Sequence, residues 1–320
     1  MKAIVCTKYG PPEVLQLREV KKPAPKAHEV LIKIHATAVT ASDCLVRGAN
    51  FPFVMRMVLR LILGFTRPRR SIMGLIVAGD VEAVGKNVTR FKPGDPVYGF
   101  TGFGGGSYAE YTCMPEAESM RGILAIKPAN MSYEEAAAVP YGAILAMHFL
   151  AKGDIQRGQR VLIYGASGAI GTTAVQLAKS LGAEVTGVCS TANLDLVKSL
   201  GADRVKDYTR EDSVDSGERY DFVLDAVGKR KSSKLKLQCQ DALTPTGKYV
   251  SVDGGMPKAR NEYRIRLKEM IEAGRFRAVI DRCYPLEQMV EAHRYVDQGH
   301  KKGNVVITVD RPAREVGELR

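Results

Sequence analysis

Residues 160–182 constrain the fold of this chain more than any other stretch, because they join an apolar run, a glycine-rich turn and an apolar helical pattern. The run at 161–164 is short enough for a buried strand. The residues after the turn predict a helix that stops near Gly182. A strand, a tight turn and a helix in this order form the first half of a βαβ unit, which predicts a parallel sheet.

The turn itself carries small residues at the spacing of a dinucleotide-binding fingerprint. Ala166, Gly168 and Gly171 occupy the three positions of a G-x-G-x-x-G pattern. A small first residue tightens the turn, the second lets the backbone approach a pyrophosphate, and the third lets the helix pack closely. The helix N-terminus would then face the phosphates. The alternative is a tight βα turn that binds no ligand.

The residues after the next predicted strand bear on the choice of cofactor. That strand ends at Cys189, and Ser190 and Thr191 follow where an NAD-binding protein would carry an acid. An acid would accept from the 2′-hydroxyl of the adenine ribose and repel a 2′-phosphate, so these two residues favour NADPH. The net charge of +12 points the same way. No Lys or Arg follows at once, so NADH stays a weaker alternative, and Tyr208 would close over the adenosine or fill the core.

Two patterns divide the 320 residues, a length that fits one large or two ordinary domains. Up to about residue 126, short apolar runs alternate with turn residues, which predicts an irregular and mostly antiparallel barrel. From Ser132 onward strands and helices alternate, starting with a helical pattern over 136–153. The composition, 45% hydrophobic and 26% charged, excludes a disordered chain, a collagen-like fibre and a polytopic membrane protein.

The cysteines and the first residues bear on the compartment. No two of the six cysteines are close enough for a Cys-x-x-Cys pair, which excludes a clustered zinc knuckle. The opening MKAIVCTKYGPPEV has neither an apolar signal core nor an Arg-rich amphipathic leader. We therefore expect reduced thiols and a cytoplasmic protein. The five histidines show no metal-ligand spacing.

The segment at 51–65, FPFVMRMVLRLILGF, is almost entirely apolar. It is too short for a comfortable membrane span, and Arg56 and Arg60 lie four residues apart on one helical face. We expect no transmembrane segment. The pattern predicts an amphipathic helix packed on its own domain, and the alternative is a contact with a lipid surface or a greasy substrate.

Motifs along nearly the whole chain resemble the zinc-independent quinone oxidoreductases of the medium-chain dehydrogenase/reductase superfamily. They are VGKNVTRFKPGDPVYGF, SYAEY, AAAVP, ASGAIG and the return segment YPLEQMVEAHRYVDQGHKKGNVVITV. The resemblance implies an α/β protein with a GroES-like β-barrel domain, a Rossmann doubly wound parallel sheet and an active site in the cleft. It assigns 1–126 and 283–320 to the GroES-like catalytic domain and 127–282 to the NADP(H)-binding domain.

Two short motifs set this chain apart from the zinc-dependent members of that superfamily. Those members have Cys-His-x-Asp where this chain has Thr-Ala-Ser-Asp at 40–43, and Gly-His-Glu where it has Gly-Leu-Ile at 74–76. A catalytic zinc needs three nitrogen, sulfur or carboxylate ligands, and Thr, Leu and Ile do not provide them. We therefore expect no metal site.

A protein without a Lewis acid must orient an easily reduced acceptor against a cofactor that brings the hydride. Quinones and conjugated enones stabilise the charge that develops when the hydride arrives, and the resemblance implies the same substrates. Thr40 is the leading candidate for a polar contact with the reacting carbonyl, followed by Asp43 and Tyr141. The alternatives are that Asp43 caps a helix and that Tyr141 only walls the cleft.

Cofactor contacts also follow from the resemblance. The loops near Val227 and Val252 should border the adenine or the nicotinamide side, because they end successive parallel strands. In the return segment the family often has Gly-Lys where this chain has Gly-Asn at 303–304. The implied cofactor contacts are Gly168, Ala169, Ile170, Ser190, Thr191, Tyr208, Val227, Val252, Gly254, Lys302 and Asn304.

The largest departure from the resemblance is a shortening near the end of the predicted parallel sheet. Only MPKARNEYRI separates SVDGG from the helical pattern RLKEMIEAG, and an apolar edge strand of the relatives is missing from it. We expect a five-stranded sheet and, because that edge pairs across a dimer in relatives, a monomer or an altered dimer. A basic run would protect the new edge, and its members are Lys258, Arg260, Arg264 and Arg266.

The leading prediction is an NADPH-dependent, zinc-free reductase of quinones or other activated enones and carbonyls. One alternative is an enoyl-thioester reductase. Another is a low-turnover NADPH-binding protein with an RNA-binding or sensor role. The sequence shows no RNA-binding motif, no interleaved aromatic platform and no Trp, so we expect no specific nucleic-acid partner.

Overall fold

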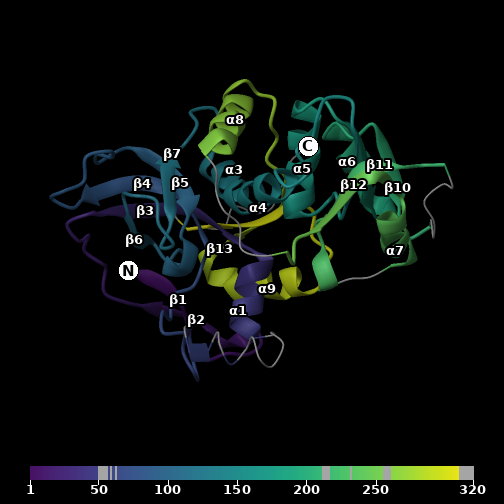
Figure 1. The fold of residues 1–320 in the computed structure, drawn as a ribbon. Helices are drawn as coiled ribbons and strands as arrows, with labels where there is room; N and C mark the ends of the chain where they lie inside the picture. The colour runs from purple at the N-terminus through teal and green to yellow at the C-terminus, as the bar shows by residue number, and fades with distance from the viewer. Residues whose placement is uncertain are drawn as a thin grey trace. The chain divides into compact units, whose positions relative to one another are not determined.

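The computed structural model describes residues 1–49, 57, 60–61, 63–210, 217–230, 233–254 and 261–309. The chain forms two compact units (Figure 1). We call Met1–Pro140 with Ile280–Arg320 the split unit, and Tyr141–Val279 the central unit. Most of the predicted helix over 51–65 lies outside the described residues, as do Lys258 and Arg260 of the predicted basic run and the side chains of Arg264 and Arg266.

The central unit is built on a parallel sheet. Its strands run β10-β9-β8-β11-β12, and every pair of neighbours is parallel. With β8 first along the chain, this is the strand order of a Rossmann sheet, and the five strands predicted from the sequence are confirmed for the described residues. The strands are β8 (Arg160–Tyr164), β9 (Glu184–Cys189), β10 (Arg204–Asp207), β11 (Tyr220–Asp225) and β12 (Leu243–Ser251).

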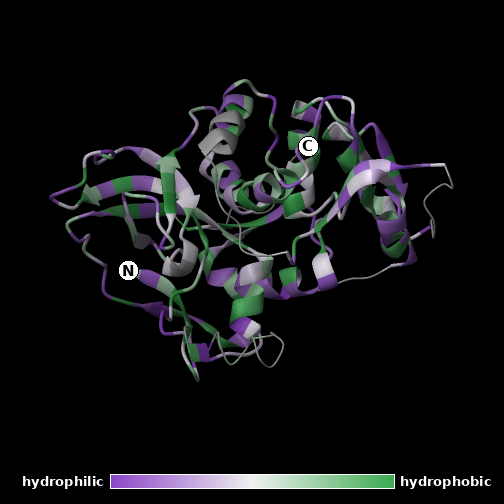
Figure 2. Ribbon diagram, in the orientation of Figure 1, coloured by the Kyte–Doolittle hydropathy of each residue, from purple (hydrophilic) through white to green (hydrophobic). Residues whose placement is uncertain are grey.

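The central unit has helices before, between and after these strands. The helix after the glycine turn, α5, ends where predicted, with Gly182 in the left-handed region at φ 82°. Buried residues run along nearly its whole length, and Figure 2 shows hydrophobic residues in green along α4 and α5. The helices are α4 (Pro140–Leu150), α5 (Ala169–Ser180), α6 (Leu194–Ser199), α7 (Lys234–Asp241) and α8 (Asn261–Glu272).

The prediction of one helical stretch over 136–153 was wrong. The structure has α3 (Tyr133–Ala138), which ends at its C-cap Val139, and α4, which begins at Pro140. Proline lacks a backbone N–H and its ring clashes with the preceding turn, so it starts a helix more readily than it continues one. Ser132 and Glu135 form a capping box at the start of α3, which fixes its N-terminus.

The split unit contains two sheets. β1 pairs with β2 in one sheet, and the other has the order β13-β14-β3-β4-β5-β7 with β6 also paired to β3. All pairs are antiparallel except β13 with β14, in agreement with a mostly antiparallel arrangement. The strands are β1 (Lys2–Cys6), β2 (Leu15–Glu19), β3 (Glu29–Val39), β4 (Ile76–Val84), β5 (Pro96–Phe100), β6 (Tyr111–Pro115), β7 (Ile123–Ile126), β13 (Ile280–Pro285) and β14 (Asn304–Thr308).

One predicted strand of the split unit begins later than expected. The motif SYAEYTC predicts a strand from residue 107, but β6 starts at Tyr111. The preceding residues bond elsewhere, since the amide of Tyr108 donates to the carbonyl of Met73 and Ala109 forms an isolated bridge with Ala3. These bonds replace the ladder that would have extended β6.

Two helices of the split unit pack together against its core. They are α1 (Ala41–Gly48) and α9 (Met289–Asp297). α9 buries Met289, Ala292 and Val296 in a hydrophobic cluster that also contains Cys44 of α1. No helix among the described residues is both long and apolar enough to cross a membrane.

Candidate functional site

The carboxyl ends of the parallel strands gather the predicted cofactor residues of the central unit at one edge of its sheet. Ser190 follows β9, Tyr208 follows β10, and Val252 follows β12. Val227 comes two residues after the end of β11. In doubly wound sheets, ligands bind outside this edge. We call it the carboxyl edge.

The glycine turn lies at this edge and is held by β9. The amides of Gly165 and Ala166 both donate to the carbonyl of Val188, at 3.0 and 2.9 Å. A Cβ added to Gly171 would lie 2.1 Å from the carbonyl oxygen of Gly165 and 2.6 Å from Cα of Ala166. The helix therefore packs on the turn at a distance that only glycine permits.

A side chain at Gly168 would meet no close contact with the rest of the protein. A Cβ at this position would have its nearest neighbour, the carbonyl oxygen of Gly165, at 3.5 Å. Gly168 is the N-cap of α5, and no side chain caps the helix there. The amides of Ala169 and Ile170 are in the first turn of α5, where backbone N–H groups attract phosphate. The turn thus has the backbone donors that a pyrophosphate requires, and no side chain covers them at Gly168.

Gly165 is a part of the turn that the sequence pattern missed. It takes φ 79°, and a Cβ there would lie 2.4 Å from Cγ2 of Val227. The signal was present as a second spacing, Gly-x-x-Gly-x-x-Gly at 165–171. Gly165 therefore lets the loop after β11 approach the turn after β8.

Tyr141 lies in the first turn of α4, close to the start of α5. A Cβ on its neighbour Gly142 would come within 2.3 Å of the carbonyl oxygen of Ala169. The two helices therefore meet at their first turns. Tyr141 itself is half-buried.

The two predicted selector residues have different surroundings. The hydroxyl of Thr191 donates to Asp207 at the end of β10, so its proton is already engaged. Asp207 also accepts from the amide and the hydroxyl of Thr209, at 2.9 and 2.6 Å. Burial raises the pKa of Asp207, but the hydrogen bonds from Thr191 and Thr209 outweigh it and lower the pKa below its usual value. Of the two selectors, Ser190 is therefore the better donor toward a ligand.

Two further residues after β10 bear on the adenosine end. The ring of Tyr208 lies 6.2 Å from the ring of Tyr164, at a tilt of 44°. Arg210 was not singled out in the sequence, yet its charge helps to lower the pKa of Asp207. Arg210 therefore supplies a positive charge at the carboxyl edge after β10. The segment directly after Ser190 supplies no such charge.

A buried ion pair holds the loop after β11. Lys236 Nζ lies 2.9 Å from Asp225 Oδ2, with 10% and 3% of the two side chains exposed. Asp225 Oδ1 accepts from the amides of Val227 and Gly228, at 3.1 and 3.0 Å. Oδ2 also accepts from the hydroxyls of Tyr249 and Ser251, at 3.1 and 3.2 Å. Asp225 therefore fixes the backbone at Val227, which the sequence predicts to lie near the cofactor.

The last predicted contact of the central unit, Gly254, follows β12. Its amide donates to the carbonyl of Ser251 at 2.9 Å, and its carbonyl accepts from Lys152 Nζ at the same distance. Val252 is held by a bond from its amide to the carbonyl of Asp225 at 3.0 Å. These bonds anchor the loop after β12 to its neighbours at the carboxyl edge.

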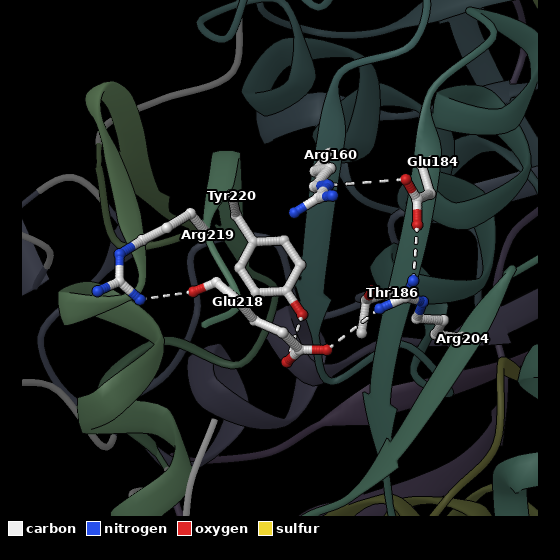
Figure 3. A pocket seen from close by; sticks show the side chains of 7 residues that line it. All are labelled: Arg160, Glu184, Thr186, Arg204, Glu218, Arg219 and Tyr220. Carbon is white, nitrogen blue, oxygen red and sulfur yellow. Dashed lines mark hydrogen bonds and ion pairs between the residues drawn. The ribbon is translucent and has the colours of Figure 1, made fainter. Parts of the chain in front are cut away.

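Two pockets in the central unit lie away from this edge. The first is at the amino ends of the strands, has a volume of about 10 Å³, and is filled by ion pairs among arginines and glutamates (Figure 3). The second, of about 440 Å³, lies beside the carboxyl ends of α5, α6 and α8. Helix carboxyl ends repel phosphate, and the predicted cofactor residues line neither pocket.

In the split unit, the structure joins Thr40 and Asp43 in one capping box. The Thr40 hydroxyl donates to Asp43 Oδ2 at 2.5 Å, and the Asp43 amide donates to Thr40 Oγ1 at 3.2 Å. Both residues are buried at the start of α1. Burial raises the pKa of Asp43 to about 6, although the bonds from Thr40 oppose this. The helix-capping alternative for Asp43 therefore describes its local structure.

A second buried group lies on the neighbouring helix α9. His293 Nδ1 accepts from Arg47 at 3.1 Å, and the other end of that guanidinium pairs with Asp297 at 2.6 Å. Burial, followed by the Arg47 charge, lowers the pKa of His293 to about 3. His293 is therefore neutral at physiological pH and accepts from a permanent cation.

Asp43 and His293 predict opposing effects of pH on stability. Between about pH 4 and 6 the folded state keeps a proton on Asp43 that the unfolded state has lost, so this residue makes stability fall as pH rises. Over the same range the unfolded state holds a proton on His293 that the folded state lacks, so stability rises with pH. The two slopes cancel in the native protein.

When one of the two residues is replaced, the pH dependence of the unfolding free energy should show the contribution of the other. We expect His293→Asn to lose about 1.4 kcal/mol of unfolding free energy per pH unit between pH 4.5 and 5.5, relative to the native protein, and Asp43→Asn to gain about as much. Denaturant titrations at several pH values measure both. Parallel pH profiles for all three proteins would contradict the assignment.

The remaining two predicted contacts lie in the split unit, next to β13 and β14. The amide of Lys302 donates to Asp281 at 3.0 Å. Asn304 is the first residue of β14 and is buried. Among the described residues, no group of three His, Cys, Asp or Glu side chains could hold a metal ion.

Comparison with known proteins gives the family. Residues 26–123 match the model of the alcohol dehydrogenase GroES-like domain, and residues 169–285 match the model of the zinc-binding dehydrogenases. The chain is 35% identical to tomato 2-methylene-furan-3-one reductase, over 96% of this chain and 79% of the relative. It is 32% identical to the chloroplastic NADPH-dependent alkenal/one oxidoreductase of Arabidopsis thaliana, with the same coverage.

A solved structure agrees with these relatives. The quinone oxidoreductase from Coxiella burnetii has a TM-score of 0.83 and 28% identity, over 97% of this chain and 99% of that one. The fold and the sequence together define an oxidoreductase of the medium-chain dehydrogenase/reductase class. Within that superfamily the chain belongs to the quinone oxidoreductase-like family, as the motifs of the sequence had implied.

Proposed function

We propose that this protein transfers a hydride from NADPH to quinones or other activated enones and carbonyls, without a catalytic zinc. The observation that carries the proposal is the carboxyl edge of the central unit. There, Gly168 begins a helix that no side chain caps, and Ser190 stands where an NAD-binding protein would carry an acid. The names of the tomato and Arabidopsis relatives, which reduce a conjugated ketone and alkenals or alkenones, support the substrate class.

The residues of the carboxyl edge fit NADPH. Gly168, Ala169 and Ile170 would hold the pyrophosphate, with Ser190, Thr191 and Tyr208 at the adenosine end. Arg210 adds a positive charge that suits a 2′-phosphate. Val227, Val252 and Gly254 would border the rest of the cofactor, and Lys302 and Asn304 would contribute from the return segment. NADPH, when bound, supplies the hydride.

Thr40, Asp43 and Tyr141 would serve the acceptor. A protonated Asp43 can donate to Thr40 Oγ1, and the Thr40 proton is then released to donate to the acceptor carbonyl. A pKa near 6 leaves Asp43 partly protonated close to neutral pH, which makes this exchange accessible. The side chains of Leu75 and Ile76 have no atoms that could bind a metal ion. The charge that develops on the acceptor would therefore be stabilised by such hydrogen bonds and by the acceptor itself.

The domain roles follow from these assignments. We assign catalysis to a GroES-like domain at 1–126 and 283–320 and cofactor binding to 127–282. Six free cysteines suit a reducing compartment, and we assign the protein to the cytoplasm, which cell fractionation would test. β12 ends the described sheet, and we assign a monomer or a dimer that does not pair this strand. Sedimentation, with amide exchange of β12 at two concentrations, distinguishes these from a β12-paired dimer.

The test of the proposed function is consumption of NADPH against a panel of quinones and conjugated enones under exclusion of oxygen. We expect turnover with several of them, no tightly bound zinc by metal analysis, and no loss of rate after treatment with a chelator. Saturated ketones serve as the matched control and should react poorly. Binding of NADPH without its consumption on any acceptor, or stoichiometric zinc, would contradict the proposal.

Replacement of Ser190 by Asp should shift the cofactor preference toward NADH. The new carboxylate repels the 2′-phosphate and accepts from a 2′-hydroxyl, so the ratio of kcat/KM for NADPH over NADH should fall at least about tenfold. Ser199→Asp adds the same charge at the end of α6 and is the control. An unchanged ratio in Ser190→Asp would show that Ser190 does not meet the ribose.

A further inference from the structure

A buried asparagine links two loops of the carboxyl edge. Asn193 ends the 3-10 turn Thr191–Asn193 after β9, and only 8% of it is exposed. Its Nδ2 donates to Ser190 Oγ at 3.0 Å and to Ser167 Oγ at 3.3 Å. Ser167 belongs to the glycine turn and Ser190 follows β9. One side-chain amide therefore joins the predicted pyrophosphate loop to the predicted ribose loop.

These two bonds decide what the serine hydroxyls can offer to a ligand. A hydroxyl has one proton to donate and two lone pairs that accept. Because both serine oxygens accept from Asn193, the proton of each is left to donate outward. A phosphate near neutral pH offers mainly acceptor oxygens, whereas a ribose hydroxyl also donates. Each serine keeps one lone pair that can still accept, but its free proton can donate to a phosphate oxygen, and two such protons side by side suit a phosphate.

The neighbouring Thr191 is a contrast within the same turn. Its hydroxyl proton is donated to Asp207, so toward a ligand the Thr191 oxygen can only accept. A phosphate, which mainly accepts, would form no hydrogen bond with it. Whether a hydroxyl at the carboxyl edge can donate to a ligand thus depends on the residue to which it is hydrogen-bonded. For Ser190 and Ser167 that residue is Asn193.

The carbonyl oxygen of Asn193 supports a role beyond packing. Asn193 Oδ1 is buried and has no hydrogen-bond partner among the described residues. A buried acceptor left without a partner costs free energy, so an apolar residue would suit a purely structural position better. An amide side chain at this position is explained by the two hydrogen bonds that Nδ2 donates to Ser190 and Ser167.

We propose that Asn193 is a positioning residue that sets the preference for NADPH, by holding Ser190 and Ser167 as donors toward the phosphorylated adenosine. This inference rests on the proposed function, since it requires the cofactor to lie along the carboxyl edge. Asn193 itself need not touch the cofactor.

Calorimetric titration with adenosine 2′,5′-bisphosphate and with AMP tests the inference without turnover. In Asn193→Asp a carboxylate would accept from both serines and turn their protons inward. We expect this variant to weaken binding of the bisphosphate at least about tenfold and binding of AMP less than about threefold. Asn193→Ala, which adds no charge, should weaken the bisphosphate in the same direction, and should have little further effect when Ser190 is already alanine.

The controls separate the possible failures. Gln159→Glu makes the same chemical change just before β8, at the opposite edge of the sheet, and should leave both affinities unchanged. If the native protein binds the bisphosphate no more tightly than AMP, the proposed NADPH preference fails and the inference fails with it. If the native preference is present but the Asn193 variants keep it, or lose both ligands equally, the inference alone is wrong.

Discussion

Gly168→Ala is expected to weaken NADPH binding at least about tenfold while leaving the melting temperature nearly unchanged. The added Cβ meets no atom of the protein closer than 3.5 Å, so the fold tolerates it. It stands, however, where the pyrophosphate would approach the first amides of α5, and lost hydrogen bonds to a charged group cost one to two orders of magnitude. Fluorescence titration of NADPH and a thermal melt measure the two quantities.

Gly171→Ala gives the matched comparison, because its Cβ would lie 2.1 Å from a backbone oxygen of the turn. We expect it to lower the unfolding free energy by about 3 kcal/mol as well as to impair binding. Gly217→Ala, with no atom within 4 Å of its Cβ, should change neither. NADPH binding that survives in Gly168→Ala would mean that the cofactor does not cross this turn.

Asp225→Ala should produce the largest loss of stability among the variants considered. It leaves the buried Lys236 without this carboxylate, and it removes the acceptor of two loop amides and two hydroxyls. Breaking a buried pair from one side costs about 3–5 kcal/mol, which lowers the melting temperature by roughly 10 °C. NADPH binding should fall too, because Val227 loses its anchor.

Lys268→Ala provides the control for this experiment. Lys268 forms an exposed pair with Glu272 in α8 of the same unit, and such pairs contribute about 0.5 kcal/mol or less. The double variant Asp225→Asn with Lys236→Met removes both charges and should be milder than Asp225→Ala alone. A melting temperature for Asp225→Ala that matches Lys268→Ala would contradict the structural role given to the pair.

The fold was predictable where local pattern and tertiary structure agree. The strand at Arg160–Tyr164, the turn and α5 follow from apolar spacing and glycines alone. The break at Pro140 was also visible in the sequence, but the apolar residues on both sides concealed it. The later start of β6 was not visible, because it depends on which distant carbonyls Tyr108 and Ala109 meet.

The candidate site divides in the same way. Gly168 and Ser190 could be found because their roles depend on a motif and on position after a strand. The bonds of Asp207 to Thr191 and of Asn193 to Ser167 could not, because parallel pairing and turn geometry bring these residues together from separate segments. The pairing of Asp225 with Lys236 likewise needs the packing of α7 on the sheet.

Transfer of deuterium tests the central claim most directly. NADPH deuterated at its hydride-donating carbon is incubated with the protein and a conjugated enone, and the product is analysed by mass spectrometry and NMR. The account predicts deuterium at the carbon β to the carbonyl, with much slower transfer from the equally labelled NADH. An unlabelled product, or equal transfer from both cofactors, would contradict it.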